Sequence, residues 1–273
     1  MRRLLIASAS AFAIFAGIPV AAQNVSNVDQ TGNDADATVL QTGNGNNSDV
    51  NQDANHANAE VTQRGGPNMS TINQNSGADG AAGGPSANAV IQQISSPTGG
   101  ALNTATITQN AISSAFSNQI GNGNTATITQ DGESLAPQEL PSSFAAFVEQ
   151  IGLNNTATIS QPGAENTATS RQYGNDGNSI IAQDGVAGTP FVNNVARVSQ
   201  EAGSDNAFSS VIQNGQDNTA DVLQFGANNE SWVTQNGSSH VADVKQYSSD
   251  NDSTVIQSGT GNTAAVNQGA PGS

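Results

Sequence analysis

The segment NTATITQ at residues 103–109 returns letter for letter at residues 124–130. Related copies are NTATISQ at residues 155–161, NTADVLQ at 218–224 and NTAAVNQ at 262–268. All follow the motif Asn-x-Ala/Ser-x-Val/Ile-x-Gln, usually followed by x-Gly-x-x-Asn. A short motif at a fixed period is typical of stacked repeat architectures. Because the same few residue types recur from end to end, we expect no catalytic, cofactor-binding or metal site, and we predict that the chain is not an enzyme.

Aligning the copies on their final glutamine gives twenty units, most of them eleven residues apart. With this glutamine as position 7, position 5 is Val or Ile except at Ser117 and Ser170, and position 3 is Ala or Ser except at Asn88. Positions 2, 4 and 6 vary freely. The position-7 residues are Gln30, Gln41, Gln52, Gln63, Gln74, Gln92, Gln109, Gln119, Gln130, Gln150, Gln161, Gln172, Gln183, Gln200, Gln213, Gln224, Gln235, Gln246, Gln257 and Gln268.

Restricted odd positions and free even positions make a period of two, which predicts half-buried β-strands rather than helices. The glycine and asparagine that follow each unit favour turns. Rungs stacked about 4.8 Å apart would place like side chains above one another. Buried amides could then form ladders, whereas a lone buried amide would cost a few kcal/mol. Besides the glutamines, we expect these ladders to include Asn103, Asn124, Asn155, Asn166, Asn218 and Asn262.

Position 3 alternates between Ser and Ala in the first five units and again from residue 179 onward. The strands are therefore of two kinds, and the full repeat is a strand-turn-strand-turn unit of about 22 residues. The predicted fold is all-β: a narrow two-sheet parallel β-solenoid, amyloid-like, of about ten rungs and roughly 45–50 Å in length.

Residues 113–130, SSAFSNQIGNGNTATITQ, fit the longer pattern Ser-x5-Gln-x-Gly-x2-Asn-x-Ala-x3-Gln. In this pattern the chain resembles curlin, the repeat protein of curli fibres, over roughly residues 24–268. The resemblance implies a secreted subunit of an extracellular amyloid fibre of the biofilm matrix, active in surface adhesion. It also implies three partners: further copies of the chain, a nucleator subunit and an outer-membrane secretion pore. Both roles within such a fibre, major subunit and minor nucleating subunit, remain open.

The chain departs from the curlin pattern in two ways. Curlin carries a Gly- and Asn-rich segment between its signal peptide and its first repeat, whereas here the first unit begins at Asn24. The chain also has about ten rungs with several insertions, which makes it longer than the familiar subunits. We expect these insertions near residues 75–85, 93–102, 131–143, 184–193 and 201–206, as surface bulges between strands.

The first residues have the pattern of a secretory signal peptide. Arg2 and Arg3 precede an apolar run at residues 4–18, and residues 20–22 (VAA) form a small-residue cleavage site. We therefore divide the chain into a signal peptide, residues 1–22, and a repeat domain, residues 23–273, exported to the cell surface. The apolar run is too short for a membrane span.

Composition agrees with a repeat fold and limits the partners. The chain has no cysteine, 4% aromatic residues and 35% hydrophobic residues, too few large apolar side chains for an ordinary globular core. Disorder is the alternative, but the periodic Val/Ile argues against it. The net charge is −16, and removal of Arg2 and Arg3 leaves four basic against 22 acidic residues, or −18. Nucleic acid and anionic membranes are therefore poor partners.

Neither end of the repeat domain carries a capping helix or divergent repeat, so both ends should expose edge strands. Outward acids would restrain premature association or act as ordinary solvated residues; examples are Asp29, Asp49, Asp221 and Asp243. Of the two histidines, His56 and His240, the second takes the place of Asn at position 1, where we expect a polar core residue. Trp232 at position 4 should lie outside.

An ice-binding solenoid is the alternative from another functional class. Its candidate residues are outward threonines of three units, which would line a flat array. They are Thr104, Thr106, Thr108, Thr125, Thr127, Thr129, Thr156 and Thr158. Most other units carry Asp, Asn, Leu or Ser at these positions, which argues against an array that runs the length of the chain.

Overall fold

The computed structural model describes residues 23–75, 86–96, 100–132, 145–163, 165–185 and 194–269. The described residues form twenty strands. In chain order they are β1 (Val25–Gln30), β2 (Asp36–Gly43), β3 (Asn47–Gln52), β4 (Asn58–Gly65), β5 (Asn68–Gln74), β6 (Asn88–Ile94), β7 (Asn103–Gln109), β8 (Ser114–Asn122), β9 (Thr125–Gln130), β10 (Ala146–Leu153), β11 (Thr156–Gln161), β12 (Thr167–Gln172), β13 (Asn178–Asp184), β14 (Val195–Gln200), β15 (Phe208–Gln216), β16 (Thr219–Gln224), β17 (Glu230–Ser238), β18 (Val241–Gln246), β19 (Asp252–Thr260) and β20 (Thr263–Gln268).

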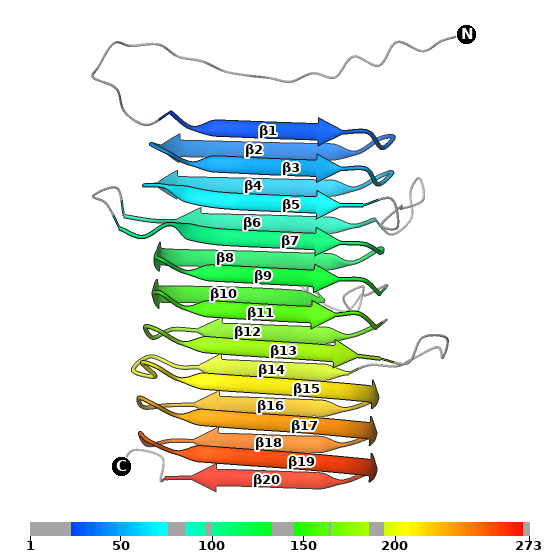
Figure 1. The fold of residues 1–273 in the computed structure, drawn as a ribbon, viewed down its shortest axis with the longest axis vertical. Helices are drawn as coiled ribbons and strands as arrows, with labels where there is room; N and C mark the ends of the chain where they lie inside the picture. The colour runs from blue at the N-terminus through cyan, green and yellow to red at the C-terminus, as the bar shows by residue number, and fades with distance from the viewer. Residues whose placement is uncertain are drawn as a thin grey trace.

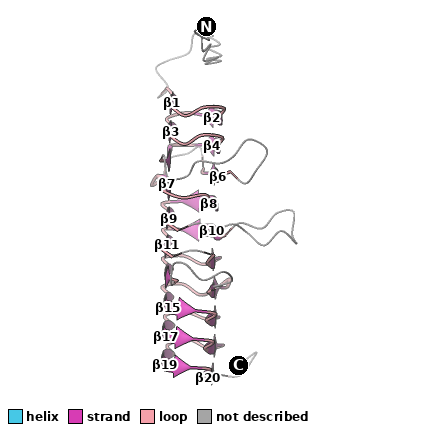
Figure 2. Ribbon diagram, turned by 90° about the vertical axis from the view of Figure 1, so that its right-hand side faces the viewer, coloured by secondary structure: helices cyan, strands magenta, loops and turns pink. Residues whose placement is uncertain are grey.

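The strands alternate between two parallel sheets. One sheet contains the ten odd-numbered strands in chain order and the other contains the ten even-numbered strands. Each strand pairs with the strand two further along the chain, so that one rung is a strand from each sheet and the turns that join them (Figure 1). Seen from the side, the two sheets form two straight walls (Figure 2). The structure is the predicted two-sheet parallel β-solenoid.

Register is set by the repeated motif. Gln109 pairs with Gln130 and Ile107 with Ile128, and the same match of like residues runs through both sheets. Burial alternates along most strands, as in β7, where every odd position is buried and every even position is half-buried. The core between the sheets is therefore a stack of layers. Small residues, Val or Ile, and glutamine each occupy one layer.

The small-residue layer differs between the sheets. Every even-numbered strand has Ala at position 3, whereas the odd-numbered strands have Ser except in β7, β9 and β11, which carry Ala105, Ala126 and Ala157. The Ser/Ala alternation of the sequence therefore marks the two sheets. The blurred middle of the chain corresponds to these three strands.

The alignment of one unit is wrong in the sequence analysis. In β6, Ala89, Ile91 and Gln93 are fully buried, while Gln92 is half-buried and points outward. Gln93 pairs with Gln63 and with Gln119. The physical reason is that this register puts alanine at position 3 and isoleucine at position 5. The other register would bury Asn88 at position 3. The interruption that follows begins after Ile94, and not at residue 93.

Four predicted features fall wholly or largely outside the described residues: the signal peptide, residues 1–22, and the insertions near residues 75–85, 131–143 and 184–193. The insertion near residues 93–102 is described only in part. That at residues 201–206 is a compact turn in which the backbone N–H of Ser204 donates to the Glu201 carbonyl. Within the part of the chain that the structure describes, no helix is long and apolar enough to cross a membrane.

The turns bring backbones of successive rungs into direct contact. Gly237 follows the ladder glutamine of β17 by two residues and has φ of 126°. A Cβ atom on Gly237 would lie 1.9 Å from the carbonyl oxygen of Gly259 in the next rung. Gly215 stands in the same relation to Gly237, at 2.0 Å. Glycine is therefore needed here for two reasons, its positive φ and the space between rungs.

We predict that Gly237→Ala lowers the melting temperature of the monomeric protein far more than Gly203→Ala. Gly203 also has a positive φ, 89°, but a Cβ added there would meet no atom within 4 Å. The control should cost about 1–2 kcal/mol for the left-handed backbone alone. Thermal unfolding followed by circular dichroism measures both variants, and equal melting temperatures would show that the rungs do not need this close approach.

Candidate functional site

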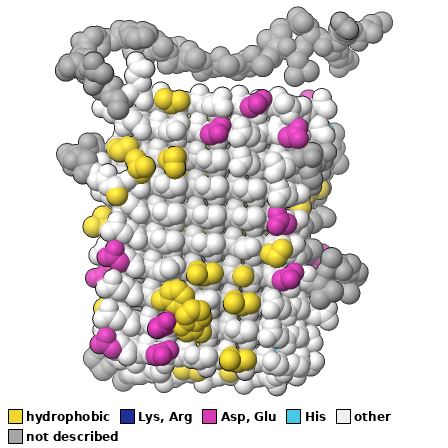
Figure 3. All heavy atoms as spheres, in the orientation of Figure 1, with side chains coloured by type: hydrophobic (Ala, Val, Ile, Leu, Met, Phe, Trp, Pro, Cys, Tyr) yellow, Lys and Arg dark blue, Asp and Glu magenta, His cyan; other side chains and the backbone are white. Residues whose placement is uncertain are grey.

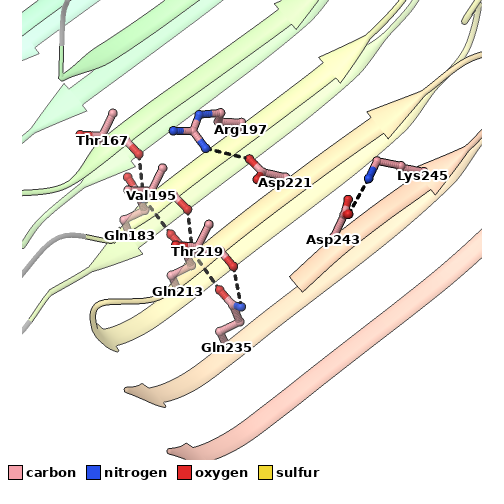
Figure 4. Close-up of polar contacts among 10 residues, drawn as sticks. All are labelled: Thr167, Gln183, Val195, Arg197, Gln213, Thr219, Asp221, Gln235, Asp243 and Lys245. Carbon is pink, nitrogen blue, oxygen red and sulfur yellow. Dashed lines mark hydrogen bonds and ion pairs between the residues drawn. The ribbon is translucent and has the colours of Figure 1, made fainter. Parts of the chain in front are cut away.

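The glutamines of position 7 form one continuous hydrogen-bonded ladder in each sheet. In every step the side-chain Nε2 donates to Oε1 of the glutamine in the next rung, at 2.7–3.1 Å. Figure 4 shows part of the odd-sheet ladder at Gln183, Gln213 and Gln235. All donors point toward the C-terminal end. Each ladder is therefore a chain of aligned amide dipoles.

The same Nε2 groups also join the two sheets. Gln213 donates to the Val195 carbonyl and Gln235 to the Thr219 carbonyl, in each case at the second position of the preceding strand (Figure 4). Every ladder glutamine from Gln41 onward makes this bond, at 2.7–3.3 Å. Both amide hydrogens are thus used, one along the stack and one across it.

The structure places nineteen of the twenty predicted glutamines in these ladders, Gln92 being replaced by Gln93. Gln30 is exposed and Gln41 and Gln268 are half-buried, because they lie in the end rungs. The ladders tolerate long insertions. Gln119 donates to Gln150, 31 residues away, at 2.9 Å, and Gln74 donates to Gln109, 35 residues away, at 2.9 Å.

The predicted asparagines lie where the turns lead into the strands, and they bond mainly to backbone groups there rather than to one another as the glutamines do. Oδ1 of Asn124 accepts from the backbone N–H of Asn155, and Nδ2 donates to the Gly152 carbonyl, both at 3.0 Å. Asn155 uses the Gly177 N–H and the Gly174 carbonyl in the same way. At these two positions the short asparagine side chain bonds backbone groups of the turns, so the prediction of amide-to-amide ladders is wrong for Asn124 and Asn155.

The remaining predicted asparagines show the same use of backbone partners. Asn103 accepts from the N–H of Asn124 and donates to the Gly121 carbonyl, although it also donates to Oδ1 of Asn68 at 3.2 Å. Asn218 donates to the Gly237 carbonyl. Asn166 donates to the carbonyls of Gly163 and Gln183. Asn262, in the exposed last rung, donates to the Ser258 carbonyl.

His240 is fully buried and takes the place of asparagine in this corner column, as predicted. Its backbone N–H donates to Oδ1 of Asn218, and its Nδ1 accepts from the N–H of Asn262 at 3.2 Å. Its Nε2 lies 3.2 Å from the Asn236 carbonyl. His56 lies in a turn, with Nδ1 4.0 Å from an Asp34 oxygen. Among the described residues, no three His, Cys, Asp or Glu side chains gather as a metal site would require.

Outward side chains form a few local clusters. Trp232 is 42% exposed, as predicted, and its ring packs on Phe208 at 4.7 Å between centroids. Two of the predicted restraining acids are paired: Asp221 with Arg197 at 3.1 Å and Asp243 with Lys245 at 2.5 Å (Figure 4). The hydrogen bond to Asp243 raises the pKa of Lys245.

The even sheet carries a polar pair of its own. Partial burial and then a hydrogen bond to the Glu149 carboxylate raise the pKa of Tyr173 to about 12. Tyr173 donates this bond to Glu149 at 2.6 Å. Its hydroxyl therefore stays protonated and neutral at neutral pH, and remains a hydrogen-bond donor.

Both ends of the solenoid present unfinished ladders. We call β1 and β2 the N-terminal edge and β19 and β20 the C-terminal edge; each pairs on one side only among the described strands. At the N-terminal edge, Oε1 of Gln30 and of Gln41 has no donor within the described chain, while both Nε2 groups are used. At the C-terminal edge, Gln257 and Gln268 have no further glutamine to donate to: Nε2 of Gln268 donates only to the Asp252 carbonyl, and Nε2 of Gln257 donates to the Val241 and Asn262 carbonyls. Inside the stack, Gln52 makes the same two kinds of carbonyl bond together with its ladder bond. One edge therefore offers amide acceptors and the other amide donors.

Fold and ladders define the chain as a polar β-solenoid of repeated glutamine rungs. The curlin associated repeat matches it at residues 32–65, 152–185 and 215–247. Each matched segment spans parts of three or more strands and contains ladder glutamines. Three segments of the chain therefore carry the curlin associated repeat, as its resemblance to curlin predicted. No curated protein matches it.

We predict that Gln130→Ala destabilises the monomer by about 2–3 kcal/mol, because it leaves buried partners in two rungs and the opposite sheet unpaired. Those partners are Nε2 of Gln109, Oε1 of Gln161 and the Ser114 carbonyl. The neighbouring Thr129→Ala, on the outer face, is the control and should change stability by about 0.5 kcal/mol or less. Urea denaturation of the two variants compares them. Similar midpoints would mean that the ladder contributes little to stability.

Proposed function

We propose that the chain is a secreted subunit that self-assembles, end to end, into extracellular curli-like amyloid fibres. The observation that carries the proposal is the complementarity of the two edges. The N-terminal edge offers free amide acceptors and the C-terminal edge offers amide donors. A contact between two different surfaces of the same chain does not close on itself in a straight stack, and it produces an open filament.

The buried residues of the two edges match one to one. If β19 of one copy pairs with β1 of the next in the register of the solenoid, the three facing pairs are Ser253 with Ser26, Val255 with Val28 and Gln257 with Gln30. These are the same pairs of residue types that β17 and β19 make within the chain. Val28 is 43% exposed in the monomer and would become buried.

The even sheet continues in the same way. If β20 pairs with β2, Ala264 faces Ala37, Val266 faces Val39 and Gln268 faces Gln41. The spacing from Gln30 to Gln41 and from Gln257 to Gln268 is eleven residues in both edges, so that both sheets can join in register at once. Both glutamine ladders would then run on without interruption from one copy into the next.

Charges do not oppose this contact. On the outer faces, Asp29 would meet Ile256, Asp36 would meet Thr263 and Asp252 would meet Val25. No acid of an edge strand would lie directly beside an acid of the next copy, a pairing that is destabilising in sheets. The strong negative charge of the chain therefore acts between distant copies, where salt screens it.

The curlin repeats support the remaining parts of the proposal. We assign the fibre to a biofilm matrix and to surface adhesion, residues 1–22 to a signal peptide, residues 23–273 to the assembling domain, and export to an outer-membrane pore. Edge complementarity serves a major fibre subunit and a minor nucleating subunit equally well. The protein content of fibres taken from cells separates these roles, since a nucleator would contribute only a small fraction of the mass.

We predict that purified residues 23–273 convert from monomers to fibres with a cross-β spacing near 4.7–4.8 Å. The double variant Gln30→Ala with Gln268→Ala should grow much more slowly, because it removes one ladder end from each edge. Thr38→Ala with Thr263→Ala changes one exposed outer residue at each of the same two edges, on β2 and β20, and is the matched control. Growth is followed with an amyloid dye and fibre diffraction. Equal rates for the two double variants would contradict the role of the ladder ends, and a persistently monomeric wild type would contradict the proposal.

We further predict that Gly259→Ala leaves the monomer nearly as stable as Gly203→Ala but blocks fibre growth. In the monomer a Cβ on Gly259 would meet no atom within 4 Å, although φ is 98°. In the proposed stack it would face the Gly32 carbonyl of the next copy, as Gly237 faces Gly259 within the chain. Melting temperature and growth rate are measured for both variants. Undiminished growth of Gly259→Ala would rule out stacking in this register.

A further inference from the structure

Three threonine-rich strands, which lie apart in sequence, are neighbours on one face of the odd sheet. β7 pairs with β9, and β9 with β11. Their outward residues form three straight columns: Thr104, Thr125 and Thr156; Thr106, Thr127 and Thr158; and Thr108, Thr129 and Ser160. We call these nine residues the hydroxyl array.

The array is flat, and the buried glutamine ladder on the inner side of the same three strands fixes the distance between them. The three strands stand on consecutive steps of the odd-sheet glutamine ladder, from Gln109 through Gln130 to Gln161, with bonds of 3.1 and 2.9 Å. Long sheets normally twist, and ladders of stacked side chains are what keeps a sheet flat. The wall formed by the odd strands is straight in Figure 2. Hydroxyl groups therefore repeat about every 4.8 Å across the strands and about every 6.7 Å along them.

The array is uncharged and its hydroxyl groups are free to bind water. All nine side chains are half-buried between their neighbours, and within the described residues none of their hydroxyl groups has a hydrogen-bond partner in the protein. Threonine is stiff at χ1, so that little side-chain freedom is lost when the array binds a surface. Figure 3 shows the odd sheet, and its middle strands carry almost no charged or hydrophobic side chains.

The outer face of the even sheet carries aromatic and charged residues. The even strands at the same height carry Phe116 on β8, Phe147 and Glu149 on β10, and Arg171 on β12. The two phenylalanine rings stack at 5.3 Å, and Arg171 lies 5.4 Å from the ring centroid of Phe147. The threonines are therefore a property of one face only, and the solenoid fold alone does not require them.

The spacing of the array matches ordered water. In a tetrahedral network with O···O distances of about 2.76 Å, second neighbours are about 4.5 Å apart and the network repeats at about 7.4 Å. Both repeats of the array lie within roughly a tenth of these values. We propose that the hydroxyl array binds the surface of ice, as a second site beside the assembly edges. Hydroxyl groups replace lattice waters, and the threonine methyl groups fill the space between them.

The test uses monomeric residues 23–273 and slowly grown ice. The fraction of protein that enters the ice is compared with that of a globular protein dissolved in the same sample. Thr127→Lys puts a charged, bulky side chain at the centre of the array. Thr234→Lys, at an equally half-buried outward position of β17, is the matched control. We expect the wild type and Thr234→Lys to be enriched in the ice and Thr127→Lys to lose this enrichment.

Two outcomes would overturn the proposal: wild-type protein excluded from ice like the globular standard, or Thr127→Lys enriched as strongly as the wild type. Thr106→Lys makes the same change on β7, so that misfolding of one variant, detected by circular dichroism, does not remove the test. Fibre growth is measured on the same samples. Because the array lies between the edges, failure to bind ice leaves the assembly proposal standing, and failure to form fibres leaves ice binding open to test.

Discussion

Hydrogen-bond satisfaction of the buried glutamine amides is the constraint on which the rest of the structure depends. An unpaired buried amide would cost a few kcal/mol, and each rung buries one such group in each sheet. In-register stacking of identical residues satisfies every amide at once, with one bond along the stack and one across to the other sheet. Parallel pairing, the 22-residue rung and the close approach of glycine backbones all follow from keeping these glutamines above one another.

The same bonding gives the solenoid a direction. Because every Nε2 points toward the C-terminal end, the ladder cannot finish within the chain without leaving acceptors at one edge and donors at the other. A soluble repeat protein would normally need polar capping units there. Here the residues of the edge strands are those of the interior strands. The proposed fibre is therefore the continuation of the internal fold by the same interactions, with the edge contact a further copy of contacts already present inside the chain.

Much of this could be predicted from the sequence, because a period of two with fixed glutamines leaves few alternatives. The sheets, the rungs and nearly all of the ladder follow from it. The double glutamine Gln92-Gln93 was ambiguous when aligned on glutamine alone, and burial of Ala89 and Ile91 decides in favour of Gln93. The asparagine bonds were not predictable from spacing, since they depend on where the turn places the carbonyls of Gly152 and Gly174. The outward threonines of the hydroxyl array were found from the sequence, whereas their placement as neighbours depends on which units share a sheet.

Inner residues of the strands hold the rungs together and outer residues face the solvent, which explains how one chain can carry two kinds of site. Inner residues must repeat, because each is the hydrogen-bond or packing partner of the next rung. Outer residues have no such restriction, and the odd sheet carries threonine, aromatic and acidic patches on the same scaffold. Insertions leave the ladders intact because they lie between strands and do not change the alternation of successive strands between the two sheets. A chain under this rule can change its outer face strand by strand, while its two edges stay complementary and its ability to stack is kept.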